Sequence, residues 1–490
     1  MLQTPPEGSH PVLIARKLLM LGIYLQGFST SNINELGNLS ISYCDVMQRA
    51  VETAARLVTS NDKFFGAVET IECIMMESMY QNNAGNLRLA YLAIRRTLIM
   101  SQMVVLRRGY SSPALHVLEP STRRRIDPER LWFRIVQSDR YLSLMLGLPQ
   151  GTSDGDFAAA KQLENCTAME RLERMDCSAG GQIIQRSCVD IQDLKTVREI
   201  DQLLQNAAAN MPPQWWLVPN LSTSAADGRD SGHAADVVRL MNQFTHYHLV
   251  QRLHLPYLLQ PSISREAHSS MVTAIVASRE LLSRFVSFRD SHAASSFCRG
   301  VDFLAFIANT ALCLAHINAR RHNSNHDILV VDNQDFLSFL AHQRPSDRGL
   351  MERVLEILER AAFVDVDAIA AKIARINRQL LMIEADASAG SSYVTSSSHT
   401  VNSDELECSG KIDDDEATLQ IYIPYLGSIR FERCSSSGGT AIASLTVDPG
   451  TARAFESQTT ENSQALTDGW DLQGVDRALF NSIFQFQDDQ

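Results

Sequence analysis

The chain has 490 residues, of which 45% are hydrophobic and 20% are charged. This composition is sufficient for a packed core and excludes a chain that is disordered throughout. The 44 basic and 56 acidic residues give a net charge of −12, but this charge is unevenly distributed. Residues 384–490 carry 18 acids and 5 bases, which leaves residues 1–383 at +1. A body so close to neutral lacks the basic surface that binding along a phosphate backbone requires.

The nine cysteines contain no C-x-x-C pair. Cys166, Cys177 and Cys188 recur at steps of eleven residues, whereas zinc sites usually bring their ligands in close pairs. Free thiols are therefore the favoured interpretation. We expect no catalytic residue, no bound cofactor and no metal ligand in this chain.

Two stretches bear on membrane association. The first ten residues lack the basic start and the apolar run of a signal peptide. The longest uncharged apolar stretch, Phe303–Ala319, contains Asn309, Thr310 and His316 and falls short of the roughly 20 strongly apolar residues of a membrane span. We therefore expect a buried helix here and no membrane partner.

From residue 11 to about residue 384, apolar residues recur at helical spacing and strand signals are few. Clusters of proline and glycine separate these segments. The pattern predicts an all-α body of packed helical hairpins. The expected helices are Pro11–Gln26, Cys44–Leu57, Phe64–Tyr80, Asn86–Val105, Leu131–Leu146, Asp190–Asn206, Ala235–Leu253, Ser269–Phe288, Gly300–Arg320, Asp335–His342 and Asp347–Glu384.

The helix over residues 131–146 has both ends marked in the sequence. Asp127 suits the N-cap position, and Pro128 fits the first turn. Gly147, followed by Pro149, is a typical stop signal. One apolar stripe is expected on it, formed by Leu131, Ile135, Leu142 and Leu146.

Arginine far outnumbers lysine, with 38 arginines and six lysines. Arginine forms bidentate pairs with buried carboxylates, so we expect helices that are joined by ion pairs. Asp139-Arg140 is the candidate for such a structural role. Arg123-Arg124-Arg125 fits a nuclear-import patch or a phosphate contact, but an exposed loop is the favoured interpretation.

Signals of enzymatic chemistry are weak. No G-x-S-x-G, Walker A or G-x-G-x-x-G element occurs. The acidic run at 413–416 lies in a Ser-rich stretch, which favours a solvated run. On a helix, His246 and His248 point about 200° apart and cannot bind one ion, so with His254 they are expected to be ordinary histidines. We therefore expect that the protein is not an enzyme.

The composition changes after residue 384. We expect a Ser/Asp-rich linker at 385–417, a short β-hairpin at 418–434, a disordered linker at 435–464 and an acidic, aromatic helix within 465–490. This helix either binds a partner or folds back onto the body. Its candidate partner-binding side chains lie at helical spacing beside aspartates and are Leu472, Val475, Leu479, Phe480, Ile483 and Phe486.

Several segments resemble the fungal-specific transcription factor family, whose members normally carry an N-terminal Zn(II)2Cys6 cluster. The most specific is Arg130–Phe133 with Asp139–Pro149, which is similar to the family signature R-L-W-W, D-R-x-L-S-L and L-G-x-P. Phe133 stands where the second Trp is usual. The residues that carry the signature, and to which we assign a structural role, are Arg130, Leu131, Trp132, Asp139, Arg140, Gly147 and Pro149. Other similar segments are Asn86–Leu106, Met211–Leu217, His246–Leu259, Cys298–His316, Leu340–Met351 and Trp470–Phe480.

The resemblance implies that residues 1–384 are the helical regulatory domain of a fungal transcription regulator. Within the family, the chain is most similar to the subgroup that regulates secondary-metabolite gene clusters. It implies a nuclear protein whose partners are the transcriptional machinery or a DNA-binding partner, together with a small-molecule effector. This sequence does not contain the six-cysteine DNA-binding module of the family. DNA contact is therefore expected only indirectly or through an N-terminal module, and zinc only with that module.

An alternative function is a helical ligand-binding module or a metabolic enzyme with no gene-regulatory role. The sequence offers no convergent set of acids, bases or metal ligands in the body, which weighs against the enzyme.

Overall fold

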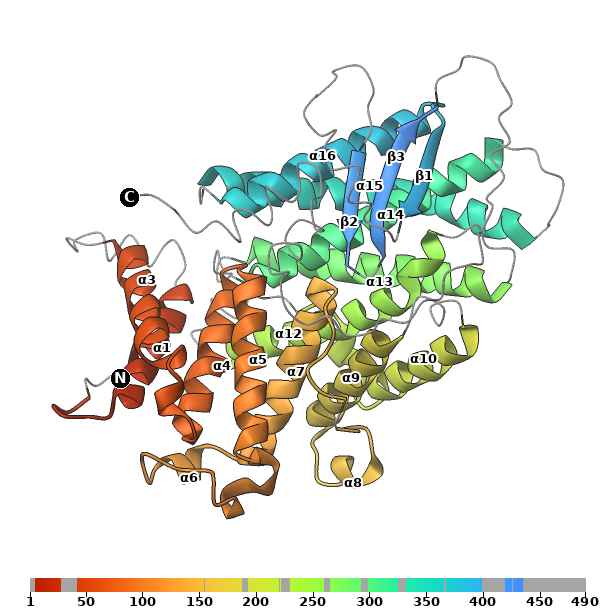
Figure 1. Ribbon diagram of the computed structural model, residues 1–490. Coiled ribbons are helices and arrows are strands. Elements are labelled where there is room, and N and C mark those ends of the chain that lie inside the picture. The colour runs from red at the N-terminus through yellow and green to blue at the C-terminus, as the bar shows by residue number, and fades with distance from the viewer. Residues whose placement is uncertain are drawn as a thin grey trace.

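The computed structural model describes residues 5–27, 42–153, 155–186, 193–219, 221, 230–259, 265–291, 298–324, 332–364, 367–398, 419–424 and 426–434. The predicted all-α body is confirmed, and a small antiparallel sheet is added to it. Figure 1 shows the N-terminal helices at one end of the molecule and the sheet lying over the last helices at the other.

The N-terminal elements extend to residue 146. They are α1 (Pro11–Gln26), α3 (Tyr43–Ala54), η1 (Ala55–Thr59), η2 (Asp62–Phe64), α4 (Val68–Asn83), α5 (Leu87–Met103), η3 (Leu106–Ser111), α6 (Thr122–Arg125) and α7 (Pro128–Leu146). Helix α1 packs on α3 and α4 around a small core of its own, which includes Leu19 and Val51. Helices α4, α5 and α7 follow side by side and begin the main core.

The remaining helices continue the body to residue 388. They are α8 (Ala160–Leu163), α9 (Ala168–Gln185), α10 (Leu194–Ala208), η5 (Pro213–Trp216), α12 (Asp230–His254), η6 (Leu255–Leu258), α13 (Arg265–Asp290), α14 (Gly300–Ser324), α15 (Asp332–Val364) and α16 (Ala368–Ser388). Helices α12, α13 and α14 pack in succession, and α16 packs on both α14 and α15. Helices α8 and α9 were not expected from the sequence, although Thr167 and Glu170 form a capping box that marks the start of α9.

Helix α14 contains a long apolar stretch and lies inside the body. Two helical stretches, Leu87–Ser111 and Gly300–Ala319, are long and apolar enough to cross a membrane. The second is completely buried by other helices, which confirms the predicted buried helix. The first is half buried, so one of its faces is turned away from the core.

Two of the expected helix boundaries were wrong. Helix α15 runs from Asp332 to Val364 through Pro345, where the sequence predicts two helices with a turn between them. Ion pairs hold the helix on both sides of the proline, since Arg344 binds Glu384 of α16 and Asp347 binds Arg279 of α13. The expected helix Asp347–Glu384 is also divided, because Asp367 caps a new helix by accepting the amides of Ile369 and Ala370.

The sheet has three strands, β1 (Tyr393–Ser398), β2 (Leu419–Ile423) and β3 (Gly427–Arg433), in the order β1-β3-β2. The hairpin β2–β3 follows the sequence prediction, but β1 lies in the segment expected to be a linker. Ile421, Ile429 and Phe431 are fully buried and belong to the main core. The sheet is therefore part of the body rather than a separate module.

Helix α7 begins and ends as predicted. The side chain of Asp127 accepts the amide of Glu129 at 3.0 Å, and Gly147 adopts a left-handed conformation with φ of 71°. Ile135, Leu142 and Leu146 of the expected stripe are buried. Trp132 is also buried and belongs to the main core.

We predict that Trp132→Ala lowers the free energy of unfolding by ~3–5 kcal/mol, because a large buried side chain leaves a cavity. Gly147→Val is also expected to destabilise, since a β-branched residue is strained at positive φ. Urea unfolding of the purified variants measures both effects. A Trp132→Ala protein that unfolds like the wild type but loses regulatory activity would assign Trp132 to a site instead of to the core.

Candidate functional site around helix α7

The buried carboxylate of Asp139 joins three parts of the chain. Its Oδ1 accepts Nη1 of Arg95 on α5 at 3.1 Å, and its Oδ2 accepts the backbone N–H of Gly151 at 2.6 Å. Desolvation raises the pKa of Asp139, while the Gly151 amide and the Arg95 guanidinium oppose this shift. The carboxylate thus fixes α5 and the turn after α7 to the middle of α7.

Arg140, the next residue, binds a different set of partners. Its Nε donates to Gln150 Oε1 at 3.0 Å, and its Nη1 donates to the carbonyl of Cys177 on α9 at 2.9 Å. Gly181 on α9 makes room for the guanidinium, because a Cβ at that position would lie 2.7 Å from Cζ of Arg140. Asp139 thus joins α7 to α5 through an ion pair, whereas Arg140 joins α7 to α9 through a backbone carbonyl.

The other signature residues also make structural contacts. Arg130 is exposed and forms an ion pair with Glu170 of α9, and Leu131 is half-buried. The carbonyl of Pro149 accepts the hydroxyls of Ser143 at 3.2 Å and of Tyr91 at 3.1 Å. The structural role that we assign to the signature residues stays a prediction.

A shallow open hollow of about 520 Å³ lies beside the turn after α7. Its lining is mostly polar and consists of Pro149, Gln150, Gly151, Thr152, Ser153, Ile184 and Gln185. Two of these residues, Gln150 and Gly151, bond to Arg140 and Asp139, so the lining of the hollow is in direct contact with the two buried charges.

Side chains of α12 and α13 hold the segment around η5 by donating hydrogen bonds to its backbone carbonyls. Arg239 and Gln243 of α12 donate to the carbonyl of Trp215, and Arg284 of α13 donates to the carbonyl of Trp216 at 2.7 Å. The Trp216 ring lies 4.8 Å from that of His246. Nothing in the sequence beyond the family resemblance pointed to this arrangement, since its partners are distant in the chain.

The three histidines of α12 are buried in separate places, as ordinary core histidines. His246 Nδ1 lies 3.0 Å from Asp176 Oδ1, and His254 Nε2 lies 3.2 Å from Asp201 Oδ1. Burial and a neighbouring arginine lower the pKa of His248 to about 3, so it is neutral at physiological pH. Among the described residues, no group of three or more His, Cys, Asp or Glu side chains is arranged to hold a metal ion.

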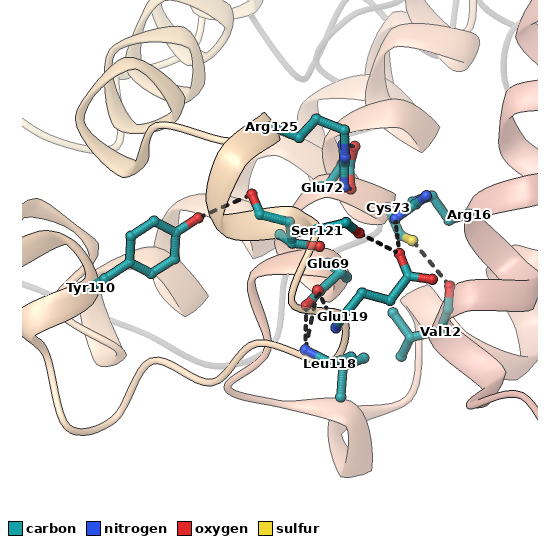
Figure 2. Close-up of polar contacts among 11 residues, drawn as sticks. Val12, Arg16, Glu69, Glu72, Cys73, Tyr110, Leu118, Glu119, Ser121 and Arg125 are labelled. Carbon is teal, nitrogen blue, oxygen red and sulfur yellow. Dashed lines mark hydrogen bonds and ion pairs between the residues drawn. The ribbon is translucent and has the colours of Figure 1, made fainter.

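A second buried carboxylate, Glu69 of α4, was not anticipated from the sequence. Both of its oxygens accept the backbone N–H of Leu118 at 3.1 Å, and Oε1 also accepts that of Glu119 at 3.1 Å. Figure 2 shows this contact with the neighbouring pair of Glu72 and Arg125. These bonds attach the segment before α6 to α4.

Arg123-Arg124-Arg125 lies in the short helix α6 and is exposed, where the sequence predicted an exposed loop. Arg125 is paired with Glu72, and the Arg123 guanidinium lies over the Tyr110 ring at 5.1 Å. The segment is thus folded onto the body instead of extended. The candidate partner-binding residues at 472–486 lie outside the described residues.

Comparison with known proteins gives relatives over most of the chain. It is 37% identical over 450 residues to a "Dehydrocurvularin biosynthesis regulator" of Alternaria cinerariae and 35% identical over 446 residues to one of Aspergillus terreus. These matches cover 91% and 90% of this chain, but 56% and 59% of the relatives. "Transcription factor sdnS" of Sordaria araneosa is 31% identical over 435 residues, which are 87% of this chain and 52% of the relative.

The chain is a relative of fungal transcription regulators. The resemblance seen in the sequence is thereby confirmed, including its similarity to regulators of biosynthesis. The chain spans 52% to 59% of the length of these relatives. No family model matches the chain, and no solved structure matches it.

We predict that Asp139→Ala lowers the free energy of unfolding by ~3–5 kcal/mol, because Arg95 and the Gly151 amide lose a buried, charged partner. Glu129→Gln on the same helix is the matched control. Glu129 is exposed, so its replacement should change stability by less than ~0.5 kcal/mol. Urea unfolding followed by far-UV circular dichroism measures both, and equal stability of the two variants would contradict the role of Asp139.

Proposed function

We propose that this protein is the regulatory part of a fungal transcription regulator that controls a biosynthetic gene set in the nucleus. The observation that carries the proposal is the similarity to named regulators over about nine-tenths of the chain. DNA is reached through a DNA-binding partner or an N-terminal module. A small-molecule effector would act on the helical body, where the hollow beside Gln150 and Gly151 is the candidate place.

The enzyme and ligand-module alternative has less support. Several buried ionisable groups of the described residues lie in pairs that join helices, such as Asp176 with His246 and Asp347 with His316. Burial raises the pKa of the Cys177 thiol to about 11, so it is protonated and a poor nucleophile at neutral pH. These pairs serve packing, and their four side chains are not among the residues that line the polar hollow near α7.

Within this function, residues 465–490 are the segment that contacts the transcriptional machinery. Apolar residues at helical spacing suit a groove on a partner, and the aspartates among them keep the segment soluble and steer it toward a basic rim. A short helix of this kind is marginal alone in water and gains its order on binding.

We predict that residues 465–490, fused to an unrelated DNA-binding domain, activate a reporter gene in a fungal host. A Leu479→Asp/Phe480→Asp variant should lose at least about fivefold of this activity, because it places charge on the apolar face. The matched control is Gln473→Asp/Asn481→Asp, which adds the same charge at polar positions. If neither the fused segment nor the fused whole chain changes reporter transcription, the regulatory function is contradicted.

A further inference from the structure

The outward face of helix α5 carries an apolar stripe. Leu89, Leu92, Ile99 and Met103 are exposed by 37%, 49%, 56% and 63%, and their spacing places them on one side of the helix, on which Arg96 also lies. These four residues are named the α5 stripe. Exposed apolar side chains gathered on one side of a helix suit a binding surface.

Positive charge borders the α5 stripe. Residues 86–112 contain five arginines and no acid. Arg95 is paired with Asp139, and Arg96 donates to the Thr59 carbonyl at 2.9 Å and lies near Glu77 of α4. Arg107 and Arg108 follow at the C-terminal end of the helix and are exposed. Because Arg95 and Arg96 lie beside acids, the positive charge that favours an acidic partner is concentrated at the C-terminal end of the helix, at Arg107 and Arg108.

The chain itself contains an apolar segment of the opposite charge. Residues 465–490 carry five aspartates and one arginine, which is a net charge of −4. Its apolar positions extend from Leu472 to Phe486, and the α5 stripe extends from Leu89 to Met103, so both span fourteen residue steps. As helices, both stripes are about 21 Å long. Spacings of three and four residues on both sides suit packing of two helices along their length.

The length of the chain permits this contact. Cys434 is the last described residue, and 38 residue steps separate it from Leu472. An extended chain of that length reaches ~125 Å. A body of this size has a radius of gyration of about 21 Å, so every part of its surface is within reach.

We propose that the α5 stripe binds residues 465–490 of the same chain. This contact goes beyond the proposed function and does not require the segment to be an activator. One consequence does rest on the proposed function: a segment held on α5 has its apolar face covered and is not available to the transcriptional machinery. The α5 stripe would then hold the regulator in an inactive state until a competing partner releases the segment.

The test uses the full chain with the photoreactive p-benzoylphenylalanine in place of Phe480. After irradiation, peptide mapping should place cross-links on residues 88–104. Ile99→Glu/Met103→Glu should lower their yield at least about fivefold, because two charges enter an apolar contact. Both side chains are largely exposed, so the fold is retained, and thermal unfolding verifies this. Phe363→Glu is the control, since Phe363 is 88% exposed on α15.

Two further arms identify the occupant. In a mixture of isotopically light and heavy chains, every cross-link should join two parts of the same chain. The cross-link yield should also fall when the salt concentration is raised from about 0.05 M to about 0.5 M, because salt screens the charges. Cross-links between light and heavy chains would assign the stripe to a second copy and overturn the proposal. Cross-links on other residues, or a stripe that instead binds anionic lipid vesicles, would also overturn it.

Discussion

The buried carboxylate of Asp139 is the constraint on which the arrangement of the body depends. A charge without access to water must be compensated, and here it is compensated by one guanidinium and one backbone amide from different elements. Gly151 permits this approach, because a Cβ at that position would collide with Arg95 and Leu98. Arg140 repeats the arrangement toward α9, so two consecutive residues connect α5, α7, α9 and the turn after α7.

The sequence was sufficient for features that are encoded locally. The ends of α7 follow from Asp127 and Gly147, because capping needs only neighbouring backbone groups. The partners of Asp139 and Arg140 were not predictable, since Arg95 lies 44 residues before Asp139 and Cys177 lies 37 residues after Arg140. Strand β1, with the letters YVTSSS, lacks an alternating apolar pattern and is a strand because it pairs with β3. Pro345 predicts a break in the helix, but ion pairs with α13 and α16 keep the helix continuous.

These observations separate the parts of the chain by role. The signature residues that mark the relationship to fungal regulators are buried or make contacts that join helices, and we propose that they support the fold. Surfaces that remain accessible in the described part of the chain include the hollow beside the turn after α7, the apolar stripe of α5 and the basic residues near α6. We propose that α7 holds the body together, while these surfaces and the C-terminal segment carry the contacts of the regulator.

The central claim is that the signature on α7 supports the fold and makes no contact with a regulatory partner. The most direct measurement compares wild type and Asp139→Asn as whole chains fused to an unrelated DNA-binding domain. The reporter activity of each protein is measured across a range of temperatures and divided by the amount of folded protein. The account predicts that activity per folded molecule is the same for both proteins and that only the folded amount falls. An Asp139→Asn protein that is fully folded and inactive would contradict it.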